Sequence, residues 1–258
     1  MADAALLSPR LLPLGDAAWT VEFGDRIDPV LHARVMGFAA ALERRRAEHR
    51  LAGVSEWVPT FRSLTVYFDP LQVDADELAA LLLRIATDSA HAVACGQRWR
   101  IPVWFGGAAG PDLDAVAKAC GQDPEAVIAR MTASVFRIFM LGFMPGFPYM
   151  GGLPPELVMP RLATPRTRVP ARSLAIAGDM CAIYPWESPG GWRLLGRTPV
   201  SLFDKSDSAR PALFAPGDMA MWQAIDADAF AAMEADAAHD RLDRSQFLAA
   251  KDEPWPAS

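Results

Sequence analysis

The amino-acid sequence predicts an α+β protein in which a ferredoxin-like α/β sandwich precedes a domain of short strands. Between residues 17 and 104, strand-like and helix-like hydrophobic periods alternate in the order βαββαβ, which is the order of a split βαβ sandwich. Between residues 135 and 224, the helical period gives way to short strands separated by glycine and proline turns. That second pattern favours a β-barrel or a β-sandwich.

The N-terminal elements are predicted from local signals. A strand is expected at residues 17–23, and Asp28-Pro29 is a helix start signal. Apolar residues then recur at spacings of four, three and four on one helical face, up to a stop at Gly53. The remaining expected elements are strands at 54–58 and 64–68, a second helix capped by Asp74, and a strand at 97–104.

A glycine-rich run from Gly106 to Gly110 is the predicted domain boundary. It lacks the lysine and the Ser/Thr of a phosphate-binding P-loop, so we interpret it as a linker. The chain then divides into an N-terminal α/β sandwich at 1–105, a strand domain at 106–225 that begins with helices at 111–119 and 124–131, and an acidic, alanine-rich helical tail at 226–258.

The charge distribution limits the classes of partner. The net charge is −6, and the residues from Asp226 onward include eight acids and three bases, which gives −5 and leaves −1 for the rest. A nearly neutral body without a basic run argues against nucleic acid or an anionic membrane as partner. The start of the chain lacks a basic signal region and no apolar stretch could span a bilayer, so a cytoplasmic protein is expected. Three widely spaced cysteines (Cys95, Cys120, Cys181) are expected to be buried thiols.

The histidines exclude several kinds of chemistry. They stand at positions 32, 49, 91 and 239, and none lies between 92 and 238. The region richest in motifs therefore cannot supply a Ser-His-Asp triad or a histidine-based metal site by itself, and no metal is inferred. Chemistry in that region has to use carboxylates, arginines, hydroxyls or backbone groups.

The segment from Gly142 to Trp192 combines glycine, proline, arginine and aromatic residues, which indicates a rigid, shaped surface. Its aromatic residues Phe143, Phe147, Tyr149 and Trp192 either form barrel core or a ligand platform, and the hydroxyl of Tyr149 favours the edge of a cleft. The run Ser188-Pro189-Gly190-Gly191 suits a type II turn. The same run could form a nest of backbone amides that binds an anion.

Arg166 and Arg168 stand two residues apart between Pro165 and Pro170. In an extended strand, residues two apart point to the same side. Two guanidinium groups on one face could bind a carboxylate or phosphate bidentately. They could equally tie this segment to Asp or Glu elsewhere in the domain, and the sequence leaves both interpretations open.

Together these motifs resemble the family of 5-oxoprolinase B subunits, which is also known as allophanate hydrolase subunit 1 and includes KipI-like carboxyltransferase-domain proteins. The motifs that carry the resemblance are Gly142–Tyr149, Pro165–Pro170, Ile176-Ala177-Gly178, Ile183-Tyr184-Pro185, Ser188–Trp192, Gly196–Pro199 and Phe203-Asp204, with Gly15-Asp16, Val58-Pro59, Arg62-Ser63-Leu64 and Gly110–Leu113 on the N-terminal side. The resemblance implies that the strand domain is a cyclophilin-like β-barrel. It also implies a hetero-oligomer with the C-type chain of 5-oxoprolinase, which together with the A-type chain cleaves 5-oxo-L-proline to L-glutamate with ATP as co-substrate.

A KipI-like regulator that inhibits a sensor histidine kinase is the alternative function, since it needs no catalytic residue in this chain. Peptidyl-prolyl isomerase activity rests on the barrel analogy alone.

The chain departs from the family pattern at three places. Met131 stands where relatives usually carry histidine, and Arg172 and Met180 replace a glycine and a glutamine. If these positions face the cleft, this chain alone is inert, because a thioether cannot act as a base. No catalytic residue is assigned. The expected substrate-binding residues are Met131, Phe147, Tyr149, Arg166, Arg168, Met180, Ser188, Gly190, Gly191 and Trp192.

Overall fold

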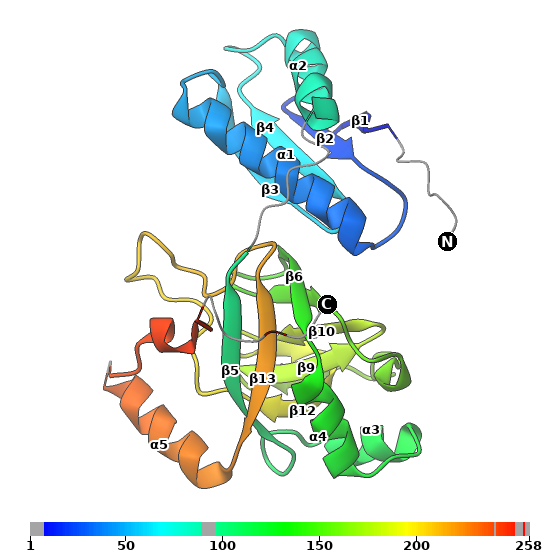
Figure 1. Ribbon diagram of the computed structural model, residues 1–258, viewed down its shortest axis with the longest axis vertical. Helices are drawn as coiled ribbons and strands as arrows, with labels where there is room; N and C mark the ends of the chain where they lie inside the picture. The colour runs from blue at the N-terminus through cyan, green and yellow to red at the C-terminus, as the bar shows by residue number, and fades with distance from the viewer. Residues whose placement is uncertain (1–7, 89–95, 240, 251–254, 256–258) are drawn as a thin grey trace. The chain divides into compact units, whose positions relative to one another are not determined.

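The computed structural model describes residues 8–88, 96–239, 241–250 and 255. The chain divides into two compact units, residues 1–95 and residues 96–258, which are drawn in Figure 1. Cys95 and His91 lie outside the described residues, so the predictions made for them have no structural counterpart.

The first unit is an antiparallel sheet with two helices. The strands stand in the order β1-β2-β4-β3 (Figure 1). Alternation in β4 is regular, with Leu64, Val66 and Phe68 buried, and these residues share one apolar core with both helices. The elements are β1 (Arg10–Pro13), β2 (Ala18–Glu22), α1 (Pro29–Ala47), β3 (Val54–Pro59), β4 (Ser63–Phe68) and α2 (Ala75–Asp88).

The predicted final strand of this sandwich is wrong. β5 (Arg98–Phe105) belongs to the second unit, where it runs parallel to β13 (Met219–Ile225), and β1 occupies the sheet edge beside β2 instead. The carboxylate of Asp218 fixes this placement, because it accepts hydrogen bonds from the backbone N–H of Gln97 (2.8 Å) and from Trp99 Nε1 (3.0 Å). A half-buried strand has the same local pattern in either sheet, so periodicity could not choose its partner.

The glycine run at 106–110 is a tight turn of the second unit. Gly106 and Gly107 have φ of 71° and 52°, values that favour glycine. A Cβ on Gly110 would lie 2.0 Å from the carbonyl oxygen of Leu195, so this turn packs directly on a barrel strand. The division between the units therefore precedes β5, and the boundary expected at 106–110 is wrong.

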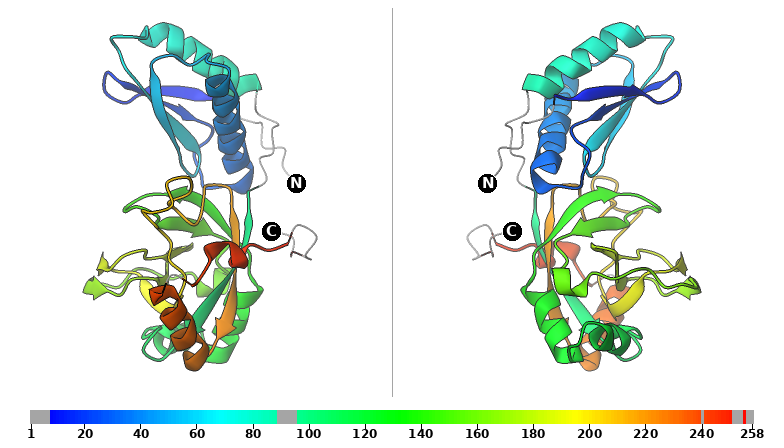
Figure 2. Two further views of the ribbon diagram at one scale, coloured as in Figure 1. Left: turned by 90° about the vertical axis from the view of Figure 1, so that its left-hand side faces the viewer. Right: turned by 90° about the vertical axis from the view of Figure 1, so that its right-hand side faces the viewer.

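The second unit is a closed barrel, with strands in the order β10-β7-β6-β13-β5-β12-β9, and it confirms the prediction of a barrel (Figures 1 and 2). Its interior is one large apolar core. A separate pair, β8 (Arg166–Val169) and β11 (Ser188–Gly190), accompanies it. The other elements are α3 (Leu113–Ala119), α4 (Pro124–Ala133), β6 (Phe136–Leu141), β7 (Pro148–Gly151), η1 (Pro155–Leu157), β9 (Ser173–Ala177), β10 (Met180–Ile183), β12 (Arg193–Arg197), α5 (Ala227–Ala238) and η2 (Arg244–Phe247).

Helix α5 is the longest helix in the described part of the acidic tail. Asp226 caps it by accepting a hydrogen bond from the N–H of Ala229 (2.8 Å). Of its side chains only Phe230 is buried, so the helix lies on the outside of the barrel (Figure 2). Within the described ranges, no helix combines the length and the apolarity that crossing a membrane would need.

Candidate functional site

A cleft of about 270 Å³ lies on the second unit. It is lined by residues of β8, of the turn that precedes α3, and of the strands β9 and β12. Three arginines from two different strands converge on it, and most of the other side chains are small or apolar. The lining residues are Trp104, Ala108, Ala109, Pro111, Arg166, Arg168, Pro170, Ser173, Leu194 and Arg197. An apolar cleft with a few convergent cations is suited to a small anionic ligand.

Arg166 and Arg168 reach the cleft because β8 is a strand. Val169 is buried, whereas the two arginines, two residues apart, both line the cleft. This arrangement matches the same-face prediction drawn from the spacing. β8 is itself held by β11, since Gly190 pairs with Arg166 and Ser188 pairs with Val169.

The two terminal nitrogens of the Arg166 guanidinium group differ in their contacts. Its Nη2 donates to Asp112 Oδ1 (2.6 Å), while Asp112 Oδ2 accepts from the backbone N–H of Leu194 (2.7 Å). Asp112 stands at the N-cap of α3 but makes no capping bond, so its carboxylate serves the arginine instead. Nη1 of Arg166 is buried and, among the described residues, has no hydrogen-bond partner. Arg166 is thus a structural tie through one nitrogen and an available donor through another.

Arg168 is bound more loosely. Its side chain is 76% exposed, and its Nε lies 2.7 Å from Oε2 of the half-exposed Glu187. Exposed ion pairs of this kind contribute about 0–1 kcal/mol to stability. Arg168 can therefore turn toward a ligand at little cost to the fold.

Arg197, at the end of β12, is a cleft residue that the sequence analysis did not select. Its Nε donates to the carbonyl of Ala171 (2.9 Å), and its side chain is 29% exposed. The signal was its place in the Gly196–Pro199 motif, which carried the family resemblance but received no role.

The predicted aromatic residues form a cluster beside β11, and none of them lines the cleft. Phe147 and Trp192 are buried, which supports the interpretation as core. Tyr184 joins them; it accepts a hydrogen bond from the backbone of Trp192, and burial raises the pKa of its phenol. Ring centroids are 5.0 Å apart for Phe147–Tyr149, 5.2 Å for Phe147–Tyr184 and 6.1 Å for both Phe147–Trp192 and Tyr149–Trp192. The expectation that this cluster lines the cleft is wrong, because the rings pack on one another.

The predicted type II turn at Ser188 to Gly191 is also wrong. Residues 188–190 are the strand β11, and Gly190 and Gly191 lack the positive φ that such a turn requires. An extended, paired strand does not form an amide nest. Gly190 is needed for another reason: a Cβ there would lie 2.3 Å from the Tyr184 hydroxyl.

Met131 and Met180 lie away from the cleft. Met131 is fully buried in the barrel core on α4, and Met180 is 9% exposed next to the turn between β9 and β10. The apolar face of α4 points inward, so position 131 belongs to the core. The prediction that these two side chains face the cleft is wrong.

Arg172 does not line the cleft either. Its ion-pair partner Glu234, however, lies close to the cleft residue Arg197. Its Nη2 donates to Glu234 Oε1 (2.5 Å) and its Nη1 donates to the carbonyl of Pro199 (2.8 Å). Its backbone has φ of 68°, in the left-handed region that favours glycine. Within the part of the chain that the structure describes, no group of three or more His, Cys, Asp or Glu residues could hold a metal ion.

The amino-acid sequence of this chain is similar to a described family and to a named bacterial protein. Residues 9–214 match the model of a family described as the carboxyltransferase domain, subdomain C and D. A protein of Bacillus subtilis (strain 168), named as the B subunit of 5-oxoprolinase, is 36% identical over 221 residues, which is 80% of this chain and 88% of that protein.

Two solved structures are also similar. TTHA0988 has a TM-score of 0.71 at 32% identity over 81% of this chain, which spans 40% of that longer chain. The Kluyveromyces lactis urea amidolyase has a TM-score of 0.74 at 21% identity, over 92% of this chain and 16% of that one, and shows the fold alone.

Proposed function

This chain belongs to the carboxyltransferase-domain family, subdomain C and D, and we propose that it is the B subunit of a 5-oxoprolinase-type hydrolase. The reaction opens the lactam of 5-oxo-L-proline to give L-glutamate, with ATP as co-substrate of the complex. The observation that carries this proposal is the similarity to a protein named as the B subunit of 5-oxoprolinase, over 88% of that protein's length. No residue of this chain is assigned to ATP.

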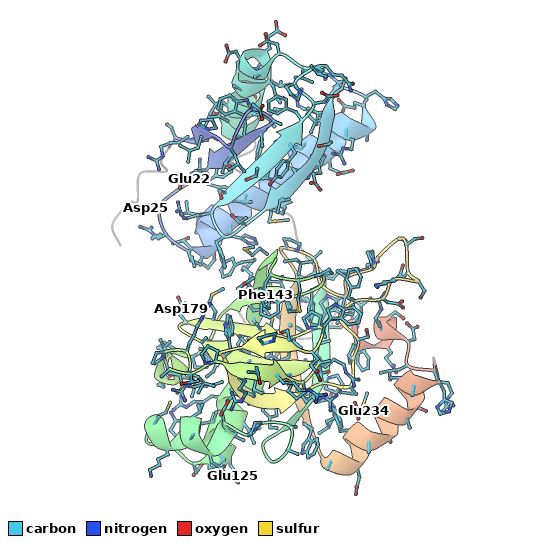
Figure 3. All side chains as sticks on the ribbon, turned by 180° about the vertical axis from the view of Figure 1, so that it is seen from behind. Glu22, Asp25, Glu125, Phe143, Asp179 and Glu234 are labelled. Atoms are coloured by element: carbon cyan, nitrogen blue, oxygen red, sulfur yellow. The ribbon has the colours of Figure 1, made fainter. Side chains whose placement is uncertain are left out.

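The complex is proposed to be cytoplasmic and to contain two further chains, which are like the C and A subunits of 5-oxoprolinase. The relative's name, which makes it one lettered subunit of an enzyme, supports an assembly of several chains. Phe143, labelled in Figure 3, is the residue we assign to a contact between subunits. It is 65% exposed although its backbone has φ of 66°. A bulky residue rarely adopts that conformation. The loop around it is fixed by hydrogen bonds from Met144 N to Gly142 O (2.7 Å) and from Phe147 N to Met144 O (3.1 Å).

Within the complex, the cleft binds the anionic group of the substrate. The free nitrogens of Arg166 and Arg168 supply charge-assisted donors to a carboxylate or phosphate, each contributing about 1.5–3 kcal/mol. Ala108, Pro111 and Leu194 supply apolar walls suited to the methylene groups of a small ring. This chain binds and orients the substrate, while the partner chains supply the groups that move protons.

The test is reconstitution. The three purified chains are mixed with 5-oxo-L-proline and ATP, and L-glutamate release is measured. Full activity should need this chain, and Arg166→Ala should lower it at least tenfold, whereas Arg130→Ala, an exposed arginine on α4, should leave it unchanged. A mixture of the two partner chains that gains nothing from this chain would contradict the proposal.

A further inference from the structure

Helix α5 lies outside the residues that match the family, yet it contacts the cleft. The match ends at residue 214, whereas α5 spans Ala227–Ala238. Its buried Phe230 packs on the cleft residue Trp104, with ring centroids 5.4 Å apart. Glu234, labelled on α5 in Figure 3, follows four residues later, and this spacing places the two side chains on the same face of a helix. The helix thus brings a carboxylate to the edge of a cationic cleft.

Two guanidinium groups share one oxygen of Glu234. Oε1 lies 2.5 Å from Nη2 of Arg172 and 3.6 Å from Nη2 of Arg197. The contact with Arg172 is a short hydrogen bond. The contact with Arg197 is an ion pair whose atoms are too far apart to form a hydrogen bond. Arg172 holds Glu234 from a backbone conformation that glycine would adopt without strain. Burial lowers the pKa of Arg172, and the charge of Glu234 opposes that shift.

Arg197 is positioned without help from Glu234. Its Nε donates to Ala171 O, and its guanidinium lies over the ring of Phe230 at 5.6 Å from the centroid. Within the described part of the chain, its Nη1 and Nη2 have no hydrogen-bond partner, and they belong to a side chain that lines the cleft. Arg197 therefore presents free donors on a fixed plane, and Glu234 acts on it only through charge.

We propose that Arg197 is the third anion-binding residue of the cleft, and that Glu234, held by Arg172, sets the strength of anion binding there. This inference rests on the proposed function in one respect, the assignment of the cleft as an anion site. The Glu234 carboxylate competes with a bound anion for Arg197. Arg172 keeps that carboxylate 3.6 Å away, so Arg197 is only partly neutralised.

This arrangement predicts opposite effects for two partners of one ion pair. Glu234→Gln removes the competing charge and should tighten anion binding about two- to fivefold, the range of a partly exposed ion pair. Arg172→Gly releases Glu234 toward Arg197 and should weaken binding by a similar factor. The double variant should bind the anion more tightly than Arg172→Gly alone, because the carboxylate that Arg172 restrains is then absent. Arg197→Gln should weaken binding about tenfold.

The experiment titrates inorganic phosphate into the full chain by isothermal calorimetry, with circular dichroism to confirm that each variant is folded. Glu125→Gln, an exposed acid on α4, is the control and should leave the affinity unchanged (Figure 3). Weaker binding in Glu234→Gln, or an Arg172→Gly variant no weaker than wild type, would overturn the role of Glu234. If Arg166→Gln weakens phosphate binding and Arg197→Gln does not, Arg197 is not an anion-binding residue, while the cleft is still an anion site. If wild type does not bind phosphate, or neither arginine matters, the anion cleft is wrong as well.

Discussion

Replacing Asp112 with alanine should destabilise the barrel unit by about 2–4 kcal/mol, because two donors lose one acceptor group. The carboxylate accepts from the N–H of Leu194 at 2.7 Å and from Arg166 Nη2 at 2.6 Å. It is 8% exposed, so water does not easily take its place. Its removal affects both the fold and the cleft.

The two donors contribute differently to that free energy of unfolding. The Leu194 N–H is buried, and leaving such a group without an acceptor costs about 1–3 kcal/mol. The Arg166 side chain is 28% exposed and can reach water, so its share is about 1 kcal/mol rather than the full value of a buried pair. For a domain of this size, the sum corresponds to a fall in Tm on the order of 10 °C.

Thermal and urea unfolding of Asp112→Ala measure the loss, and amide hydrogen exchange at Leu194 reports the local cause. Asp112→Asn keeps one acceptor oxygen and should lose about half as much. Asp114→Ala removes an exposed acid from the first turn of α3 and should change stability by about 0.5 kcal/mol or less. If Asp112→Ala is no less stable than Asp114→Ala, or if Leu194 exchange is unchanged, the assigned role of Asp112 is wrong.

Three further predictions concern residues with different surroundings. Arg168→Ala should weaken ligand binding about tenfold, or about 1.4 kcal/mol, at unchanged Tm; a large fall in Tm would make this exposed arginine a structural tie. Hydrogen bonds from Arg10 and Arg62, against the opposing effect of burial, hold the pKa of Glu22 below its usual range, so its stabilising effect should be present at pH 7 and lost in acid. In urea titrations, Glu22→Gln should therefore unfold more easily than wild type at pH 7, and this difference should shrink as the pH falls below about 4.5 and vanish only once the carboxyl of the folded protein is itself protonated; a pH-independent difference would contradict this. Met131→His should lower stability by about 1–3 kcal/mol, because it buries a polar ring in the core; a gain in activity at unchanged Tm would return position 131 to the cleft.

Local patterns predicted most elements but not the partner of β5. Alternation in β4 and the start signal at Asp28 are local, and the structure confirms both, since the Asp28 side chain accepts from the N–H of Val30 at 2.7 Å. The parallel partner of β5, however, is β13, more than a hundred residues later in the chain. Pairing over that separation depends on Asp218 and on the closure of the barrel. Neither is visible in a window of a few residues.

The site shows the same division between local and distant information. The convergence of Arg166 and Arg168 follows from their spacing on one strand, and both do line the cleft. Asp112 was missed because an aspartate before a helix is ordinarily a capping residue. Its actual bonds go to groups 54 and 82 residues away in the chain. The aromatic residues were misassigned because composition does not tell a packed ring cluster from a binding platform.

One residue beside the cleft has a backbone conformation that is rare for a bulky side chain. Arg172 occupies a left-handed backbone position at φ 68°, where glycine avoids strain. The same residue donates a hydrogen bond of 2.5 Å to Glu234. Glu234 belongs to α5, an acidic helix that lies beyond the residues matched by the family model. Without Arg172, the Glu234 carboxylate would pair with Arg197 and neutralise one of the three cleft cations. The strained arginine therefore keeps the cleft positive while α5 is docked against it, which links the conformation of one residue to the binding property of the site.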